Sequence, residues 1–372
     1  MKVAIIVQDM CGQGVQYATA MAARMFVARG WAVDLLVSQV HVDCVRLGQK
    51  AFEVPQSVKW IYMPSRRARG NALWLRRYLR RVCVDLVLIE GMLYNKSIVL
   101  ATFGISKQKL PKLAMVTHGN TDSVAGGLLR RTSIYLKHWA LYRKLSSLMV
   151  VNQKSAINMR SRCKWLPKLT IACVNNACCD EIFWEKIAKE PTHPWLINKI
   201  CFTVVAAGAY EPYKDHMTLL RAVKIIKGKG RMMRVIIFGR GSLLGKYKEY
   251  IRENELEDMV SIGSYTLQLP AEIKASDGFV LSSNWESFGI VLAEGLACQV
   301  PCVATDAPYG PGEILNYGKY GRLVPICDPE AMARALVDLM DGKIAIAPDE
   351  SWQRYTIDVV GQKYFAAMGV AC

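Results

Sequence analysis

The sequence lacks the patterns typical of a metalloprotein, a disulfide-stapled protein or an integral membrane protein. Its 12 cysteines are scattered, with no Cys-x-x-Cys pair, no His/Cys cluster at metal-ligand spacing and no Asp-x-Asp motif nearby. No stretch reaches about 18 uninterrupted apolar residues, so nothing is expected to span a bilayer. The opening apolar run, Lys2–Val7, is too short for a signal peptide. We therefore expect free thiols in a reducing cytoplasm.

The basic charge is unevenly distributed along the chain. The first 198 residues hold 29 Lys+Arg against 11 Asp+Glu, whereas the rest holds 19 against 20. This asymmetry indicates an anionic partner for the first half alone.

Short apolar runs alternate with helix-like stretches in two successive series. The first series has strands expected at Lys2–Val7, 33–37, 85–89, 112–117 and 147–151. The second follows a Pro-Thr-His-Pro linker at 191–194, with strands expected at 202–206, 233–238, 278–281 and 302–305. The pattern predicts an α/β chain of two Rossmann-like, doubly wound domains whose strands end at a common cleft.

Two carboxylates flank the start of an apolar helix in the second series. Glu286 lies in the loop after the strand 278–281, and Glu294 interrupts an otherwise apolar run. The loop Ser287-Phe288-Gly289 offers backbone N–H groups at the helix N-terminus, which is a natural seat for phosphate. The alternative is that Glu286 is a solvated loop residue and that Glu294 pairs with a nearby Lys or Arg.

The segment around these carboxylates resembles the E-x7-E region of retaining GT-B glycosyltransferases of family 4. The resemblance covers 275–289, continues through Val-Pro-Cys-Val-Ala-Thr-Asp at 300–306, and ends in Gly-Pro-Gly-Glu-Ile-Leu at 310–315. It extends over most of the C-terminal half and is looser in the N-terminal half. The resemblance implies a GT-B fold, with domains at 1–195 and 196–356 and a last helix (357–372) that returns to the first domain.

The resemblance also implies roles for matched residues. Glu286 would lie beside the donor sugar ring, and Glu294 would bind the ribose. Amides of Phe288 and Gly289 would hold the diphosphate, and Lys214 matches the lysine that neutralises the leaving group. The arginine usual in this segment is replaced by Ala209. Arg240 is a candidate substitute, although an arginine facing solvent at a strand end is an equal alternative.

The first half offers weaker site candidates. Gly12 and Gly14 stand where the family has a glycine loop facing the donor phosphates, although a Gly-x-Gly pair also occurs in plain turns. His118 follows a strand, points toward the expected cleft and matches the family's histidine near the reacting sugar. A structural histidine is the alternative.

A basic, aromatic helix is expected at 73–82. Trp74, Leu75, Tyr78, Leu79 and Val82 share one face, and Arg76, Arg77, Arg80 and Arg81 share the other. This arrangement suits an interfacial helix on anionic lipid. The alternative is a helix packed on the sheet with a solvated basic face. Because no nucleic-acid-binding module accompanies the charge, we do not expect a nucleic acid partner.

Taken with the resemblance, these features predict an enzyme that moves a hexose or N-acetylhexosamine from a nucleotide sugar to a glycan or glycolipid acceptor. The segment at 310–313 resembles one common in enzymes that use UDP-sugars, so we expect a UDP-linked donor. Such acceptors occur in lipopolysaccharide, capsule or lipid-linked oligosaccharide biosynthesis. We expect retention of configuration, no metal or other cofactor, and a peripheral position on the inner face of the cytoplasmic membrane. Two rivals remain: a GT-B sugar-nucleotide epimerase or phosphorylase, and a non-catalytic GT-B binding protein.

Overall fold

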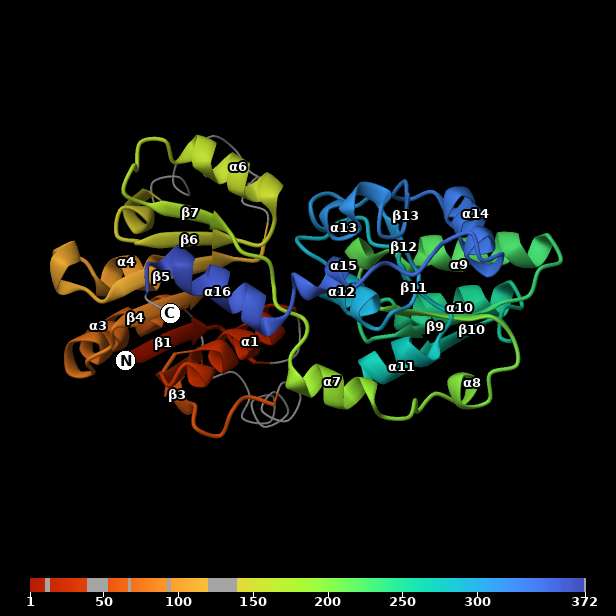
Figure 1. Ribbon diagram of the computed structural model, residues 1–372. Helices are drawn as coiled ribbons and strands as arrows, with labels where there is room; N and C mark the ends of the chain where they lie inside the picture. Colours follow the sequence, from red (N-terminus) through yellow and green to blue (C-terminus); the bar gives the residue numbers. More distant parts are fainter. Residues whose placement is uncertain (11–13, 39–52, 66–67, 92–94, 120–138, 371–372) are drawn as a thin grey trace. The chain divides into compact units, whose positions relative to one another are not determined.

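A computed structural model describes residues 1–10, 14–38, 53–65, 68–91, 95–119 and 139–370. Within these residues the chain forms two compact units. Unit 1 is Met1–Ala177 together with Ile357–Cys372, and unit 2 is Cys178–Thr356. In each unit a parallel sheet is covered by helices on both faces (Figure 1).

Unit 1 contains a parallel sheet whose described strands follow the order β3-β2-β1-β4-β5-β6-β7. The strands are β1 (Lys2–Val7), β2 (Ala32–Ser38), β3 (Lys59–Met63), β4 (Leu86–Glu90), β5 (Lys112–Thr117), β6 (Ser147–Val150) and β7 (Thr170–Cys173). The described helices are α1 (Gly14–Ala28), α3 (Ala72–Arg81), α4 (Asn95–Ala101), α6 (Gln153–Arg162) and α16 (Ile357–Met368). The central strands β1 and β4 are almost completely buried, as expected for a parallel sheet covered on both faces.

The C-terminal helix α16 packs on α1 and on β6 and β7 of unit 1 (Figure 1). Phe365 anchors it, because its ring packs edge-on against Phe26 of α1 with the centroids 5.0 Å apart. The guanidinium of Arg29 lies 4.0 Å from the centre of the same ring. The last segment of the chain is therefore part of the first unit.

Unit 2 contains a second parallel sheet, in the order β10-β9-β8-β11-β12-β13. Its strands are β8 (Thr203–Ala207), β9 (Arg234–Phe238), β10 (Val260–Gly263), β11 (Gly278–Leu281), β12 (Cys302–Thr305) and β13 (Arg322–Val324). The helices are α7 (Glu181–Ile187), α8 (Pro194–Ile197), α9 (His216–Gly228), α10 (Leu244–Glu253), α11 (Leu269–Ala275), α12 (Ile290–Ala297), α13 (Gly310–Ile314), α14 (Pro329–Met340) and α15 (Glu350–Gln353). Apolar side chains of α9 and α14 form a core with β8, β9 and β11.

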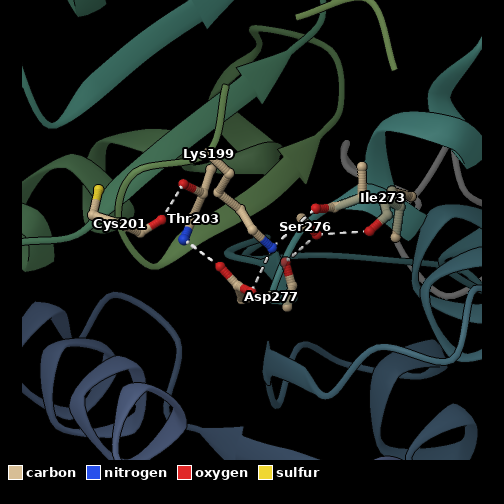
Figure 2. Close-up of polar contacts among 8 residues, drawn as sticks. Lys199, Cys201, Thr203, Ile273, Ser276 and Asp277 are labelled. Atoms are coloured by element: carbon tan, nitrogen blue, oxygen red, sulfur yellow. Dashed lines mark hydrogen bonds and ion pairs between the residues drawn. The ribbon is translucent and has the colours of Figure 1, made fainter. Parts of the chain in front are cut away.

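Polar contacts fix the amino-terminal ends of the two central strands of this sheet (Figure 2). The carboxylate of Asp277 accepts a hydrogen bond from the backbone N–H of Thr203 at 2.8 Å and pairs with Lys199 at 2.7 Å. The backbone N–H of Asp277 donates in turn to the carbonyl of Thr203. The register of β8 against β11 is thereby set, and with it the positions of the loops at their carboxyl ends.

The units divide after Ala177, whereas the sequence suggested a boundary at residue 195. The segment after Ala177 packs on unit 2, where α7 contacts α11. Thr192 adds to this attachment, because its backbone N–H donates to the Glu272 carboxylate at 2.9 Å. The run at 191–194, which the sequence suggested as a linker, therefore lies within unit 2.

Candidate functional site

The loops that follow β8 and β11 meet at the carboxyl edge of the unit 2 sheet, because these strands are neighbours. Lys214 ends a 3-10 turn, Pro212–Lys214, immediately before α9. Asp215 caps α9 from the left-handed region (φ 42°), and its side chain accepts a hydrogen bond from the N–H of Thr218. The cap fixes the direction in which the chain leaves Lys214.

Lys214 and Glu286 form a largely buried ion pair. The Nζ of Lys214 lies 2.5 Å from Oε1 of Glu286, and the two side chains are 16% and 9% exposed. The hydroxyl of Ser283 donates to the same oxygen at 2.8 Å. Two donors therefore converge on Oε1 and hold the carboxylate in one orientation.

The two loops are also joined through their backbones. The N–H of Asn284 donates to the carbonyl of Tyr213 at 2.9 Å, and the hydroxyl of Ser282 donates to the carbonyl of Lys214 at 3.1 Å. The hydroxyl of Thr305 on β12 donates to the carbonyl of Ser283. The cation and the carboxylate are thus held in place before any ligand binds, which is what electrostatic catalysis requires.

The N-terminus of α12 follows directly after Glu286. Gly289 caps the helix with φ 101°, a conformation that favours glycine. A Cβ at Gly310 would collide with the carbonyl of Phe288, so a second glycine allows the two loops to approach. In the described part of the chain the amides of Phe288 and Gly289 donate to no protein acceptor. Ser287 precedes them and is half-buried. Backbone N–H groups at the N-terminus of a helix, as at Phe288 and Gly289, are suited to binding an anion.

Glu294 lies in the second turn of α12 and is 7% exposed. Burial raises the pKa of its carboxyl to about 8, against the opposing effect of Lys186, and Asp180 raises it further. Among the described residues none donates a hydrogen bond to this carboxyl. The sequence-based alternative of a close pair with a Lys or Arg is not found among the described residues, where Lys186 acts on this carboxyl only through its charge.

Arg240 is exposed, and its guanidinium lies 5.0 Å from the centre of the Tyr265 ring. Burial raises the pKa of the Tyr265 phenol, Arg240 lowers it, and the Glu294 carboxylate raises it. Tyr265 therefore lies within electrostatic reach of both residues. The backbone next to Ala209 is fixed to this loop, because the N–H of Tyr210 donates to the carbonyl of Arg240.

His118 belongs to unit 1, where it follows β5. Its Nε2 lies 2.6 Å from Oε2 of Glu90 at the end of β4. Gly14 begins α1 and is exposed, whereas Gly12 lies outside the described residues.

The aromatic face of the basic helix α3 is covered by protein, so the expectation that this face meets lipid was wrong. Its aromatic face packs on the core of unit 1 and does not point outward: Trp74 stacks on Tyr78 with the centroids 5.5 Å apart. Arg76 is not part of a free basic face either, because its guanidinium donates to the carbonyls of Ala101 and Phe103 at 3.2 and 2.6 Å. The remaining arginines, Arg77, Arg80 and Arg81, are exposed.

Two further results concern metals and membranes. No group of three or more His, Cys, Asp or Glu side chains with metal-binding geometry occurs within the described residues. Every helix in the described ranges is too short or too polar to cross a bilayer.

The sequence analysis did not single out Ser283 or Glu90, whose side chains contact the predicted site residues Glu286 and His118. Ser283 stands three residues before Glu286, and Glu90 ends a buried strand, so position was the available signal in both cases. A buried carboxylate costs free energy unless other groups hold it. Its presence at the carboxyl end of an apolar parallel strand therefore indicates a functional residue.

The similarity to a known family model lies within the second half of the chain. Residues 193–357 match the family model described as glycosyl transferases group 1. An uncharacterized glycosyltransferase of Methanocaldococcus jannaschii is 27% identical over 223 residues, covering 56% of this chain and 54% of its own. A phosphatidyl-myo-inositol mannosyltransferase of Mycobacterium leprae is 31% identical over 173 residues, covering 43% and 44%. The chain thus spans about half the length of these relatives.

Among solved structures, HepE of Anabaena in complex with UDP and glucose superimposes with a TM-score of 0.77. The match covers 99% of both chains at 16% identity, so it shows the fold alone. The predicted fold class is confirmed: the chain has the two-domain α/β fold of GT-B glycosyltransferases, and its residues 193–357 are similar to the glycosyl transferases group 1 model.

Proposed function

We propose that the protein is a retaining glycosyltransferase of family 4 that moves a hexose or N-acetylhexosamine from a UDP-sugar to a hydroxyl of a glycan acceptor. The observation that carries the proposal is the Lys214–Glu286 pair, held beside the free amides at the start of α12. A cation, an anion seat and an oriented carboxylate in one place suit a sugar joined to a diphosphate.

In this reaction the bond between the anomeric carbon and the diphosphate oxygen breaks, and its electron pair leaves with UDP. The acceptor hydroxyl oxygen bonds to the same carbon, from the face that the diphosphate leaves, and its proton passes to the departing diphosphate oxygen. The charge that develops on the leaving diphosphate is stabilised by the Lys214 ammonium and by the amides of Phe288 and Gly289. Oε1 of Glu286 already accepts hydrogen bonds from Lys214 and Ser283. The other oxygen, Oε2, accepts one from a hydroxyl of the donor sugar.

Glu294 and Arg240 complete the proposed donor site. The buried Glu294 carboxyl takes the ribose hydroxyls, since a polar group without an internal partner gains most from a ligand. Arg240 supplies the second cation, in place of the family's usual arginine at the position of Ala209. It does so from a neighbouring loop, with its guanidinium over the ring of Tyr265. UDP as the nucleotide is supported by the Gly-Pro-Gly-Glu segment at 310–313 and by the UDP complex of HepE. We propose no metal or other cofactor, in line with the family resemblance.

The proposal is tested by incubating the purified protein with UDP-sugars, first alone and then with glycan acceptors, with EDTA present throughout. We expect slow release of UDP and free sugar without acceptor, and faster release with it. Formation of an epimeric UDP-sugar without acceptor would favour the epimerase rival. If UDP binds tightly but no sugar bond is cleaved with any donor, the protein is a non-catalytic binding protein.

A membrane-borne acceptor is part of the proposal, with the protein peripheral on the inner face of the cytoplasmic membrane and with no nucleic acid partner. Leu73, Arg77, Arg80 and Arg81 share the outer face of α3, and Leu73 is 73% exposed. Phe103 is also 73% exposed, and its carbonyl is bonded to Arg76 of α3. Basic and apolar groups that face outward together suit an anionic lipid surface. The phosphatidyl-myo-inositol mannosyltransferase relative supports a lipid-borne acceptor.

Replacing Arg77, Arg80 and Arg81 with glutamine should abolish co-sedimentation with anionic vesicles at low salt. Each basic residue near such a surface contributes about 1 kcal/mol, so the partition coefficient should fall roughly 100-fold. The matched control replaces Lys224, Lys246 and Lys248, which are exposed on unit 2, and should bind nearly as the wild type does. Equal loss in both variants, or undiminished binding, would contradict a specific lipid surface on α3.

A further inference from the structure

Glu90 and His118 are brought together by the pairing of β4 and β5. Glu90 is the last residue of β4 and lies opposite Val116 in the parallel register, two residues before His118. The N–H of Gly91 donates to the carbonyl of Val116 at 2.9 Å, which holds the two strand ends together. Both side chains therefore stand at the carboxyl edge of the unit 1 sheet, where α/β folds place their ligands.

The contact between them is close and buried. The His118 Nε2 lies 2.6 Å from Oε2 of Glu90, with the histidine side chain 8% exposed and the glutamate side chain 0% exposed. The other oxygen, Oε1, accepts a longer hydrogen bond from the hydroxyl of Tyr364 at 3.4 Å. Burial, together with Glu90, raises the pKa of this phenol well above its ordinary value, so the hydroxyl remains a donor. A carboxylate without solvent contact is costly unless donors hold it, and here α16 and β5 each supply one.

Within the part of the chain that the structure describes, the second ring nitrogen of His118 has no partner. Its Nδ1 is buried and makes no hydrogen bond to the described residues. A proton on Nδ1 would leave a buried N–H without an acceptor among the described residues, at a cost of about 1–3 kcal/mol. With the proton on Nε2, where Glu90 accepts it, Nδ1 is an acceptor lone pair.

We propose that Glu90 is a positioning residue, supported by Tyr364, that fixes His118 as the Nε2–H tautomer and so presents Nδ1 to accept a hydrogen bond from a sugar hydroxyl. The second ring nitrogen of a functional histidine is set by the partner of the first. The choice of a sugar hydroxyl as ligand rests on the proposed function, whereas the tautomer depends only on the contacts within unit 1.

The test is ¹⁵N NMR of the histidine side chains in the full-length, unliganded protein at pH 8, with the His118 signals identified from their absence in His118→Asn. We expect the signature of an unprotonated Nδ1 and a protonated Nε2. In Glu90→Met, which removes the acceptor but keeps the side-chain length, the two nitrogen signals should move toward a tautomer mixture. Glu90→Gln, with an amide carbonyl in place, provides a second variant if the methionine variant does not fold.

Activity provides the second readout, measured as UDP release from whichever UDP-sugar the wild type cleaves. Glu90→Met should lower kcat roughly 10- to 100-fold with a smaller change in KM, the range typical for removing the partner of a functional histidine. Tyr364→Phe should have a smaller effect in the same direction.

The matched control is Asp34→Asn, which removes another buried carboxylate of unit 1, held by Tyr78 at 2.6 Å and Lys2 at 2.9 Å. It should lose stability and leave the His118 signals unchanged.

A proton found on Nδ1 in the wild type, or a tautomer that Glu90→Met and Glu90→Gln leave unchanged, would overturn the proposal. Loss of the tautomer without slower UDP release would make Glu90 a purely structural residue and would overturn its positioning role. The NMR result needs no donor or acceptor. A wild type that cleaves no UDP-sugar would therefore contradict the proposed function and the sugar ligand, while the tautomer would still be decided.

Discussion

Replacing Lys214 with alanine should lower the rate of UDP release from a UDP-sugar by roughly 10²- to 10³-fold, the cost of removing one oriented donor from a developing charge. Lys214 is held by Glu286 and by the loop contacts at Tyr213, so its ammonium is in place before the donor arrives. The loss should fall mainly on kcat, because the leaving group is most highly charged in the transition state. Folding should suffer less, by about 1–3 kcal/mol, since Ser283 still donates to the Glu286 carboxylate.

Lys199→Ala is the matched control for this variant. Lys199 forms an ion pair with Asp277 in the same unit at 2.7 Å, but at the amino edge of the sheet (Figure 2). It should leave UDP release unchanged. Turnover of Lys214→Ala within threefold of the wild type, with a donor that the wild type cleaves, would remove Lys214 from the mechanism.

Glu294→Gln should change both the pH dependence of stability and the affinity for UDP. Because burial raises the pKa of the folded-state carboxyl to about 8, from an ordinary value of 4.5, the folded protein holds this proton more tightly than the unfolded chain does. The stability that this proton contributes is fully present below about pH 4.5 and is lost as the pH rises through 8. The loss amounts to roughly 5 kcal/mol, because each pKa unit corresponds to about 1.4 kcal/mol.

Glutamine cannot ionise, so the unfolding free energy of Glu294→Gln should be flatter than that of the wild type between pH 5 and about 9. The variant should be the more stable protein above pH 8. Above pH 8, where the wild-type group is a carboxylate, the affinity of the variant for UDP should be about 10- to 100-fold lower, because an amide is a weaker acceptor for ribose hydroxyls. Urea unfolding and calorimetric UDP titration across this range measure both effects. The surface variant Glu249→Gln should show neither, and a pH profile parallel to that of the wild type would contradict the assignment for Glu294.

The central strands of both sheets were predictable from sequence, whereas the edge strands were not. β1, β4, β8 and β11 have neighbours on both sides and almost completely buried side chains, so they read as continuous apolar runs. The four strands that the sequence did not reveal, β3, β7, β10 and β13, are the outer strands of the two sheets. Their side chains are mostly half-buried or exposed. A strand with one neighbour needs no apolar run, so hydrophobic periodicity does not detect it.

The part of the proposed donor site that lies in one contiguous motif was predictable from the sequence. Glu286, Phe288 and Gly289 lie in a single loop, and the structure brings Lys214 to that loop, as the order of the strands requires. His118 contacts Glu90, which in turn contacts Tyr364, and Arg76 contacts carbonyls at and just beyond the end of α4. These partners come from distant segments, so no local sequence pattern predicted them. For helix α3 the sequence correctly predicted an amphipathic helix. An amphipathic pattern does not tell whether protein or lipid covers the apolar face, and in the structure protein covers it.

The central claim is that unit 2 binds a nucleotide sugar and stabilises the departing diphosphate. The most direct measurement is UDP release over a panel of UDP-sugars by the wild type and by Lys214→Ala at equal concentration. We predict that at least one donor is cleaved by the wild type and that the variant loses nearly all of this activity. No cleavage of any donor by the folded wild type, or equal cleavage by both proteins, would contradict the claim.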